Sequence, residues 1–365
     1  MLSLGIVGLP NIGKSTLFQA ITKKQVGIAN FPFTTIDPNI GIAPVKDERL
    51  EKIAAIQKSE KVIPATVKFV DIAGLVKGAA QGLGLGNQFL AHIREVTAIV
   101  EIIRLFINEN VPHVEKNVDP LRDLEIISTE LILADLETLE RIFTKLEGDI
   151  KRHDKEAMAK FELIKKLENH LQSNKWISSY PLNEKDRLLI KEYNFLTAKP
   201  LLIVLNVDES ISEKEIQKIK EEILNEMAGQ LQSEDVLAMD LAKELDMTNL
   251  TPKEAEELGL TRASYLNNLD DLIKRGYQIL NLITFFTTTG PEETRAWPLK
   301  NGSTVWEAAG LIHRDFQEKF IKAEIVNWLD FVELKSWAKC RETGKLKIEG
   351  RDYIVQDGDI VYYKI

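Results

Sequence analysis

The chain has 365 residues, of which 44% are hydrophobic, enough for two or three domains with their own cores. Its formal net charge of -9 argues against a general nucleic-acid binder and against sequence-specific DNA binding, because such proteins present a basic face. The stretch 335–351 is locally basic, which fits an RNA-binding surface but is more typical of an ordinary solvated one. The single cysteine, the short apolar runs and the lack of a signal-peptide pattern predict a cytoplasmic protein without a membrane partner.

In chain order, the first part alternates apolar strands with helical segments. A strand at 4–7 precedes a helix at 14–23, and further strands are expected at 40–45, 66–71, 97–106 and 201–206. Apolar strands separated by helices are typical of a mostly parallel sheet covered on both faces. This part is therefore predicted to be an α/β domain.

Residues 117–197 differ in texture, because they are rich in Leu, Glu and Lys and poor in glycine. Apolar residues recur at steps of three and four from Leu124 to Ile150, and again from Met158 to Leu171 after a polar break at His153. Two such stripes joined by a turn predict an antiparallel helical hairpin. The apolar strand at 201–206 follows, so we expect the hairpin to be inserted within the α/β domain.

The last part, residues 281–365, is expected to form a small α+β domain. Strands are predicted at 284–287, 294–299, 353–355 and 360–363, with one helix at 305–312 and glycines between them.

A complete phosphate-binding motif begins directly after the first strand. Residues Gly8 to Ser15 match G-x-x-x-x-G-K-S, and the helix expected at 14–23 supplies the required context. The two glycines let the loop turn its N–H groups towards phosphate oxygens, and the helix start adds its dipole. Lys14 would carry a positive charge to the β- and γ-phosphates, Ser15 would ligate Mg²⁺, and Thr16 would bind the α-phosphate.

A second motif, D-x-x-G, ends the strand at 66–71. Asp71 would hold a water on Mg²⁺, and the N–H of Gly74 would sense the γ-phosphate. The loop-like stretch 30–39 lies between the two motifs and contains Thr34 and Thr35. One of these threonines would complete the Mg²⁺ shell only when a γ-phosphate is bound, which describes a nucleotide switch.

The element that reads the base is expected after the strand at 201–206. GTPases carry N-K-x-D there, whereas this chain has Asn206, Val207, Asp208 and Glu209. The guanine-reading carboxylate is therefore one methylene longer, which favours ATP as a hypothesis. Asp208 leaves guanine specificity open, and a measured GTP preference above about tenfold would exclude the ATP interpretation.

These motifs together resemble the YchF/Obg-like ATPases. The likeness depends on the P-loop with Asn11, the run N-F-P-F-T-T-I-D-P-N at 30–39, the segment 71–75, N-x-x-E at 206–209, and C-terminal patterns similar to a TGS domain. It implies an α/β fold: a Ras-like P-loop G domain with an inserted antiparallel helical hairpin and a C-terminal β-grasp (TGS) domain. The implied domains are residues 1–116 with 198–280, the insertion 117–197, and the TGS domain 281–365.

The resemblance also assigns site residues. The nucleotide would be contacted by Asn11, Ile12, Gly13, Lys14, Ser15, Thr16, Asn206, Val207 and Glu209. Ser15 and Thr35 would ligate Mg²⁺ with Asp71 acting through water, and Asn11 makes K⁺ a candidate second ion. The family pattern departs at 239–242, where Asp240 stands in a turn that supports the base and could alter the purine choice.

Catalysis is expected to be slow, because Leu75 stands where Ras-like enzymes keep a water-orienting glutamine. The resemblance implies His113 as the residue that assists instead, with Lys14 as the other catalytic group. A lone loop histidine is more often a plain surface residue, so a change to alanine must test this.

The implied activity is a Mg²⁺-dependent ATPase whose nucleotide state switches binding to the ribosome or translation machinery. Two alternatives stay open: a guanine-specific Obg-type GTPase, and a nucleotide-sensing adaptor in which hydrolysis is incidental.

Overall fold

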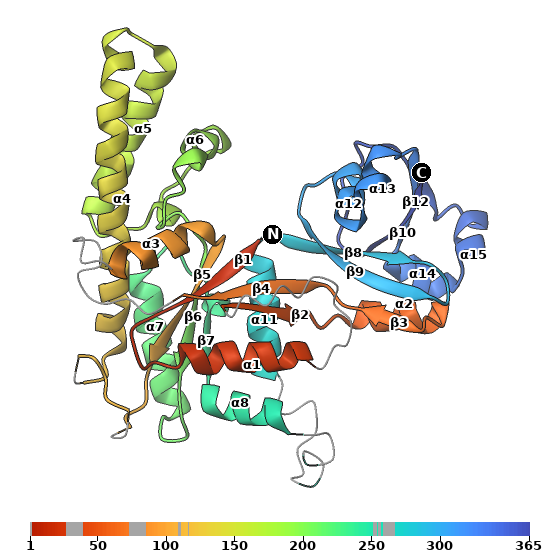
Figure 1. The fold of residues 1–365 in the computed structure, drawn as a ribbon, viewed down its shortest axis with the longest axis horizontal. Coiled ribbons are helices and arrows are strands. Elements are labelled where there is room, and N and C mark those ends of the chain that lie inside the picture. The colour runs from red at the N-terminus through yellow and green to blue at the C-terminus, as the bar shows by residue number, and fades with distance from the viewer. Residues whose placement is uncertain are drawn as a thin grey trace. The chain divides into compact units, whose positions relative to one another are not determined.

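A computed structural model describes residues 2–26, 39–72, 85–108, 111–115, 117–250, 254, 257 and 267–365 (Figure 1). The chain divides into two compact units, Met1–Gly41 with Lys68–Leu269, and Ile42–Val67 with Asp270–Ile365. Among the described residues, no helix is both long and apolar enough to cross a bilayer.

A six-stranded sheet in the order β2-β4-β1-β5-β6-β7 lies mainly in the first unit, with residues 42–44 of β2 and 66–67 of β4 grouped with the second. Its strands are β1 (Ser3–Val7), β2 (Ile40–Pro44), β4 (Thr66–Asp71), β5 (Ala98–Arg104), β6 (Leu201–Asn206) and β7 (Val236–Met239). The pairs β1–β4, β1–β5, β5–β6 and β6–β7 are parallel, as the apolar runs predict. Because parallel strands end at one edge, Val7, Asp71, Arg104, Asn206 and Met239 are brought to the same side of the sheet, where ligands bind in such folds.

Helices connect these strands. They are α1 (Lys14–Val26), α3 (Leu85–Glu95), α4 (Pro120–Lys151), α5 (Lys155–Gln172), α6 (Glu184–Ile190), α7 (Glu213–Glu226) and α8 (Leu241–Asn249), while α11 (Asn267–Ile279) crosses the boundary between the units. Helix α1 packs against α8, and α4 packs against β5 and α7.

The predicted hairpin is confirmed as α4 and α5, which lie side by side and run in opposite directions (Figure 1). His153 in the turn has φ 60°, and the Asp154 side chain caps α5 by accepting a hydrogen bond from Ala157 N at 2.8 Å. The rings of Phe143 in α4 and Phe161 in α5 pack edge to face, with their centroids 5.3 Å apart. Met158, which the stripe places in the seam, is 46% exposed, so this part of the prediction is wrong.

Asp135 joins α4 to the segment that enters β6. This carboxylate is fully buried and accepts hydrogen bonds from Leu196 N at 2.9 Å and Thr197 N at 2.8 Å. Burial raises its pKa, and the hydrogen bonds from Thr197 and Leu196 oppose that rise. The hairpin base is thus fixed to the sheet by a buried polar contact that the apolar stripe does not reveal.

The second unit contains another six-stranded sheet, whose strands follow the order β11-β10-β12-β8-β9-β3. Its strands are β3 (Lys61–Ile63), β8 (Leu282–Thr288), β9 (Glu293–Lys300), β10 (Lys322–Asn327), β11 (Lys347–Glu349) and β12 (Asp359–Lys364), and its helices are α2 (Glu48–Gln57), α12 (Val305–Ile312), α13 (Arg314–Glu318), α14 (Trp328–Leu334) and α15 (Trp337–Glu342). Val305, Ala308 and Ala309 of α12 pack into a core with Phe285 of β8. A helix held on a mixed sheet in this way is the expected β-grasp arrangement.

One feature of this unit differs from the sequence expectations. The predicted strand at 353–355 is reduced to an isolated bridge between Ile354 and Thr304. Residues 42–67 are grouped with the second unit, and β3 among them pairs with β9. The inserted hairpin belongs to the first unit, and its exact domain limits stay a prediction.

Candidate functional site

The loop between β1 and α1 has the backbone that its glycines predict. Gly8 and Gly13 have φ of 145° and 107°, values that side chains other than glycine rarely adopt. A Cβ on Gly8 would clash with the side chain of Ile12, and one on Gly13 would lie 2.5 Å from Asn206 Nδ2. Asn11 also has a positive φ, 63°, which asparagine tolerates better than most residues. Both glycines are therefore required by conformation and by close packing.

Lys14 is the first residue of α1, and its side chain folds back over the loop. Its Nζ donates hydrogen bonds to Gly8 O at 3.0 Å and Leu9 O at 2.7 Å. Burial lowers the pKa of Lys14 to about 8, against the opposing effect of the nearby Asp71 charge. Burial likewise raises the pKa of Asp71, and the Lys14 charge lowers it. This cation lacks a full counter-charge, so an anion placed at the loop would stabilise it.

Asn206 has a role that the motif alone does not show. It is 5% exposed, its Nδ2 donates to Ile12 O at 2.8 Å, and its Oδ1 accepts from Leu241 N at 3.3 Å. The side chain thus clamps the phosphate-binding loop to the start of α8. Ile12, assigned to the nucleotide by resemblance, is 2% exposed, and its carbonyl accepts the hydrogen bond of this clamp. Its contact with the nucleotide stays a prediction.

A cavity of about 540 Å³ opens beside the loop. The loop and the start of α1 line it with Asn11, Gly13, Lys14, Ser15 and Thr16. The strand ends and following turns contribute Phe106, Asn108, Val111, Asn206, Val207, Asp208, Asp240, Leu241 and Ala242. This volume is in the usual range for a small-molecule site.

The two candidate base-reading acids separate in the structure. Asp208 lines the cavity, and its Oδ1 accepts a hydrogen bond from Ser210 N at 2.9 Å. Glu209 is exposed and is not among the lining residues. Asp240 also lines the cavity, where it caps α8 by accepting from Lys243 N at 3.0 Å. The fourth position of N-x-x-E is therefore not part of the cavity lining.

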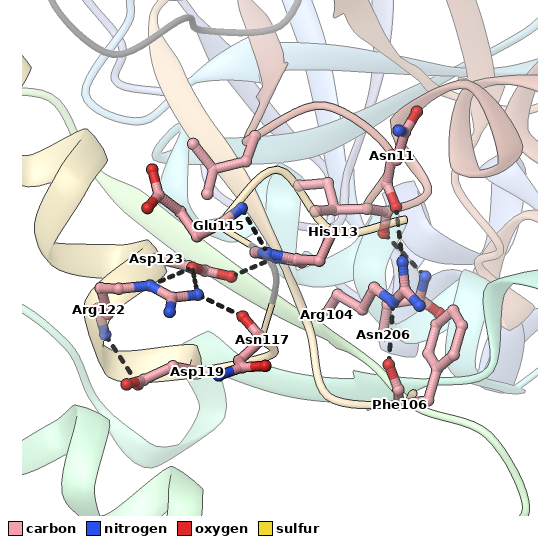
Figure 2. A network of polar contacts seen from close by, with 12 residues as sticks. Asn11, Arg104, Phe106, His113, Glu115, Asn117, Asp119, Arg122, Asp123 and Asn206 are labelled. Atoms are coloured by element: carbon pink, nitrogen blue, oxygen red, sulfur yellow. Dashed lines mark hydrogen bonds and ion pairs between the residues drawn. The ribbon is translucent and has the colours of Figure 1, made fainter. Parts of the chain in front are cut away.

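His113 does not line the cavity. Its side chain is 2% exposed, and its Nε2 lies 2.8 Å from Asp123 Oδ2 of α4 (Figure 2). The Nδ1 atom accepts a hydrogen bond from Glu115 N at 3.2 Å, and Arg122 pairs with the same carboxylate at 2.9 Å. The neighbouring carbonyl of Pro112 accepts from Asn11 Nδ2 at 3.3 Å. The histidine loop thus contacts the phosphate-binding loop on one side and the hairpin base on the other.

Burial of charge extends to β5, where the apolar strand contains two charged residues. Glu101 is 1% exposed, and burial raises its pKa well above the usual value, with the Asp123 charge adding to that rise. Arg104, also 1% exposed, ends the strand beside the cavity wall. A charge inside an apolar run is the sequence signal for both residues, and neither belongs to a phosphate- or base-binding motif.

A Mg²⁺ ion fits the residues that the structure describes. The Ser15 hydroxyl lines the cavity at the start of α1, and the carboxylate of Asp71 ends β4 close enough to affect Lys14 electrostatically. Hydroxyl and carboxylate oxygens are ligands that Mg²⁺ prefers. Thr34, Thr35, Gly74 and Leu75, the predicted switch residues, lie outside the described residues.

Comparison with known proteins gives consistent results. Residues 3–134 match a family described as 50S ribosome-binding GTPase, and residues 282–365 match the YchF-GTPase C-terminal family, described as a protein of unknown function. The ribosome-binding ATPase YchF of Bacillus subtilis is 42% identical over 100% of this chain and 99% of its own length. The protein of the same name from Haemophilus influenzae is 42% identical over 99% and 98%. The Schizosaccharomyces pombe YchF GTPase structure superposes with a TM-score of 0.85 at 35% identity, covering 100% of this chain and 97% of that one.

Proposed function

The chain belongs to the YchF family, and we propose that it is a Mg²⁺-dependent ATPase whose nucleotide state controls binding to the ribosome in the cytoplasm. The observation that carries the proposal is the cavity built around Lys14, Ser15 and Thr16 at the start of α1. Backbone N–H groups, a helix dipole and a partly buried cation meet there, which is the arrangement that binds a polyphosphate.

ATP is favoured over GTP by the position of Glu209. In GTPases the fourth residue of this motif reads guanine, but here it is exposed and outside the cavity. Val207 lines the cavity and offers an apolar contact to a purine. Asn206, whose amide group binds two backbone groups, is proposed to support the base only through this clamp.

The chain's own groups would act mainly by positioning and charge. When a nucleotide binds, Lys14 would exchange the carbonyls of Gly8 and Leu9 for phosphate oxygens and neutralise charge that develops in the transition state. Ser15, Thr35 and water-linked Asp71 would hold the Mg²⁺, which supplies electrostatic stabilisation of the transferred phosphoryl group. K⁺ is proposed as a second ion beside Asn11.

His113 is retained as the proposed group that orients the attacking water. Its ring would have to leave Asp123 to reach the cavity, since the two side chains now lie 2.8 Å apart. Changing His113 to alanine should then lower the K⁺-stimulated turnover at least tenfold while ATP affinity stays unchanged. His92→Ala, on the exposed face of α3, is the matched control. Unchanged turnover in His113→Ala would remove this residue from the mechanism.

Equilibrium binding to the full chain tests the activity as a whole. ATP should bind, Lys14→Ala should weaken it by about two orders of magnitude, and Ser15→Ala should abolish the Mg²⁺ dependence. The guanine-specific alternative is favoured by one observation, that Asp208 lines the cavity. A GTP dissociation constant more than about tenfold below that of ATP would establish that alternative.

A further inference from the structure

Arg104 is a buried arginine at the cavity edge of the sheet. It ends β5, directly opposite Asn206 in the neighbouring strand β6, and it is 1% exposed. A buried guanidinium is costly unless its donors are satisfied, so its partners indicate what it does.

Those partners are backbone carbonyls from two separate parts of the chain. Within the loop that follows β5, Nε donates to Phe106 O at 2.9 Å (Figure 2). In the same loop, Nη1 donates to Val111 O at 2.9 Å and Nη2 to Asn108 O at 3.4 Å. From the same Nη1 a further hydrogen bond reaches Asn11 O of the phosphate-binding loop at 3.4 Å. One side chain therefore fastens the loop after β5 to the phosphate-binding loop.

The residues held in this way form part of the cavity. Phe106, Asn108 and Val111 all line it, and so does Asn11. The guanidinium also lies 4.5 Å from the centre of the Phe106 ring, which adds a cation–π contact. A loop is held in position by its contacts with the rest of the fold. The cavity wall formed by Phe106, Asn108 and Val111 is therefore held in position by Arg104.

We propose that Arg104 is a positioning residue of the nucleotide site, which holds Phe106, Asn108 and Val111 against the phosphate-binding loop and so preforms the wall that receives ATP. The inference rests on the proposed binding of ATP in this cavity. A preformed wall raises the affinity for ATP because the conformational entropy of these loop residues is lost on folding and not on binding. Arginine is required, because its planar fork reaches acceptors in several directions, whereas lysine offers its donors from one point.

The test is the change Arg104→Lys in the full chain, measured by ATP titration and by steady-state ATP hydrolysis. Loss of the fork should raise the KM and the dissociation constant for ATP about tenfold and leave kcat within about twofold. Arg141→Lys provides the control, because Arg141 lies exposed on α4 and donates to Glu137 O of its own helix. A purely structural role would lower the melting temperature without this separation of KM from kcat.

A milder variant covers the case in which Arg104→Lys fails to fold. Phe106→Leu keeps every carbonyl that Arg104 binds but removes the ring beneath the guanidinium, and ATP affinity should fall about threefold. Wild-type affinity in Arg104→Lys, or in Phe106→Leu where the first does not fold, would overturn the inference. The proposed function has a separate test: it fails if Lys14→Ala binds ATP as tightly as the wild type. Failure of the Arg104 inference alone would leave the Lys14→Ala result as predicted, so the two failures can be told apart.

Discussion

Asn206 provides the sharpest test of how this site is built. Changing it to alanine removes the donor to Ile12 O and the acceptor for Leu241 N, at 2.8 and 3.3 Å. Each buried backbone group that loses its partner costs about 1–3 kcal/mol, so for the two groups we expect the free energy of unfolding of the nucleotide-free protein to fall by about 2–6 kcal/mol. For a unit of this size, at about 2–4 °C per kcal/mol, that corresponds to a melting temperature about 4–24 °C lower.

The assay is calorimetry or urea denaturation of the nucleotide-free protein. Asn206→Asp should not rescue stability, because it places an oxygen against the carbonyl of Ile12. Asn169→Ala, exposed on α5, should change stability by less than about 0.5 kcal/mol. A nucleotide-free Asn206→Ala protein as stable as the wild type, with only its ATP affinity reduced, would show that Asn206 reads the base and is not a clamp.

Three further predictions concern the same unit. Gly13→Ala places a methyl group 2.5 Å from Asn206 Nδ2 at φ 107°, so ATP binding should be lost in titrations, whereas Gly148→Ala, with open space around it, should leave binding unchanged. Burial lowers the pKa of Lys14 from 10.5 to about 8, so between these pH values the folded protein has lost a proton that the unfolded chain still holds. The free energy of unfolding should therefore rise with pH in this range, while ATP affinity falls because Lys14 loses its charge. Both trends should vanish in Lys14→Met. Asp135→Asn should lower the unfolding free energy by about 2 kcal/mol in urea denaturation, because an amide cannot accept all the bonds that the carboxylate accepts; wild-type stability would contradict the anchoring of the hairpin base.

The parts of the fold that were predictable from the sequence depend on local patterns. The phosphate-binding loop is encoded by Gly8, Gly13 and Lys14 at fixed spacing, and the hairpin by apolar residues at helical intervals. Strand β3 had no such signal, because it is three residues long, largely exposed, and formed through pairing with β9 far along the chain. Its place in the second sheet is therefore a property of the folded chain and not of the local sequence.

The site shows the same division. The identity of Asn206 as part of N-x-x-E was visible, but its contact with Ile12 O depends on residues nearly two hundred positions apart. The pairing of His113 with Asp123 likewise joins a loop to a helix and leaves no spacing rule in the sequence. Arg104 was detectable only as a charge in an apolar strand, since its carbonyl partners carry no sequence signal.

Ribosome co-sedimentation in three nucleotide states tests the proposed switch most directly. The full chain would be sedimented with ribosomes in the presence of a non-hydrolysable ATP analogue, ADP or no nucleotide, beside Lys14→Ala. The bound fraction should differ at least threefold between the ATP-like state and the other two in the wild type, and should be the same in all states for Lys14→Ala. If the ribosome-bound fraction of the wild type is the same in all three nucleotide states, the proposal that the nucleotide controls ribosome binding is contradicted.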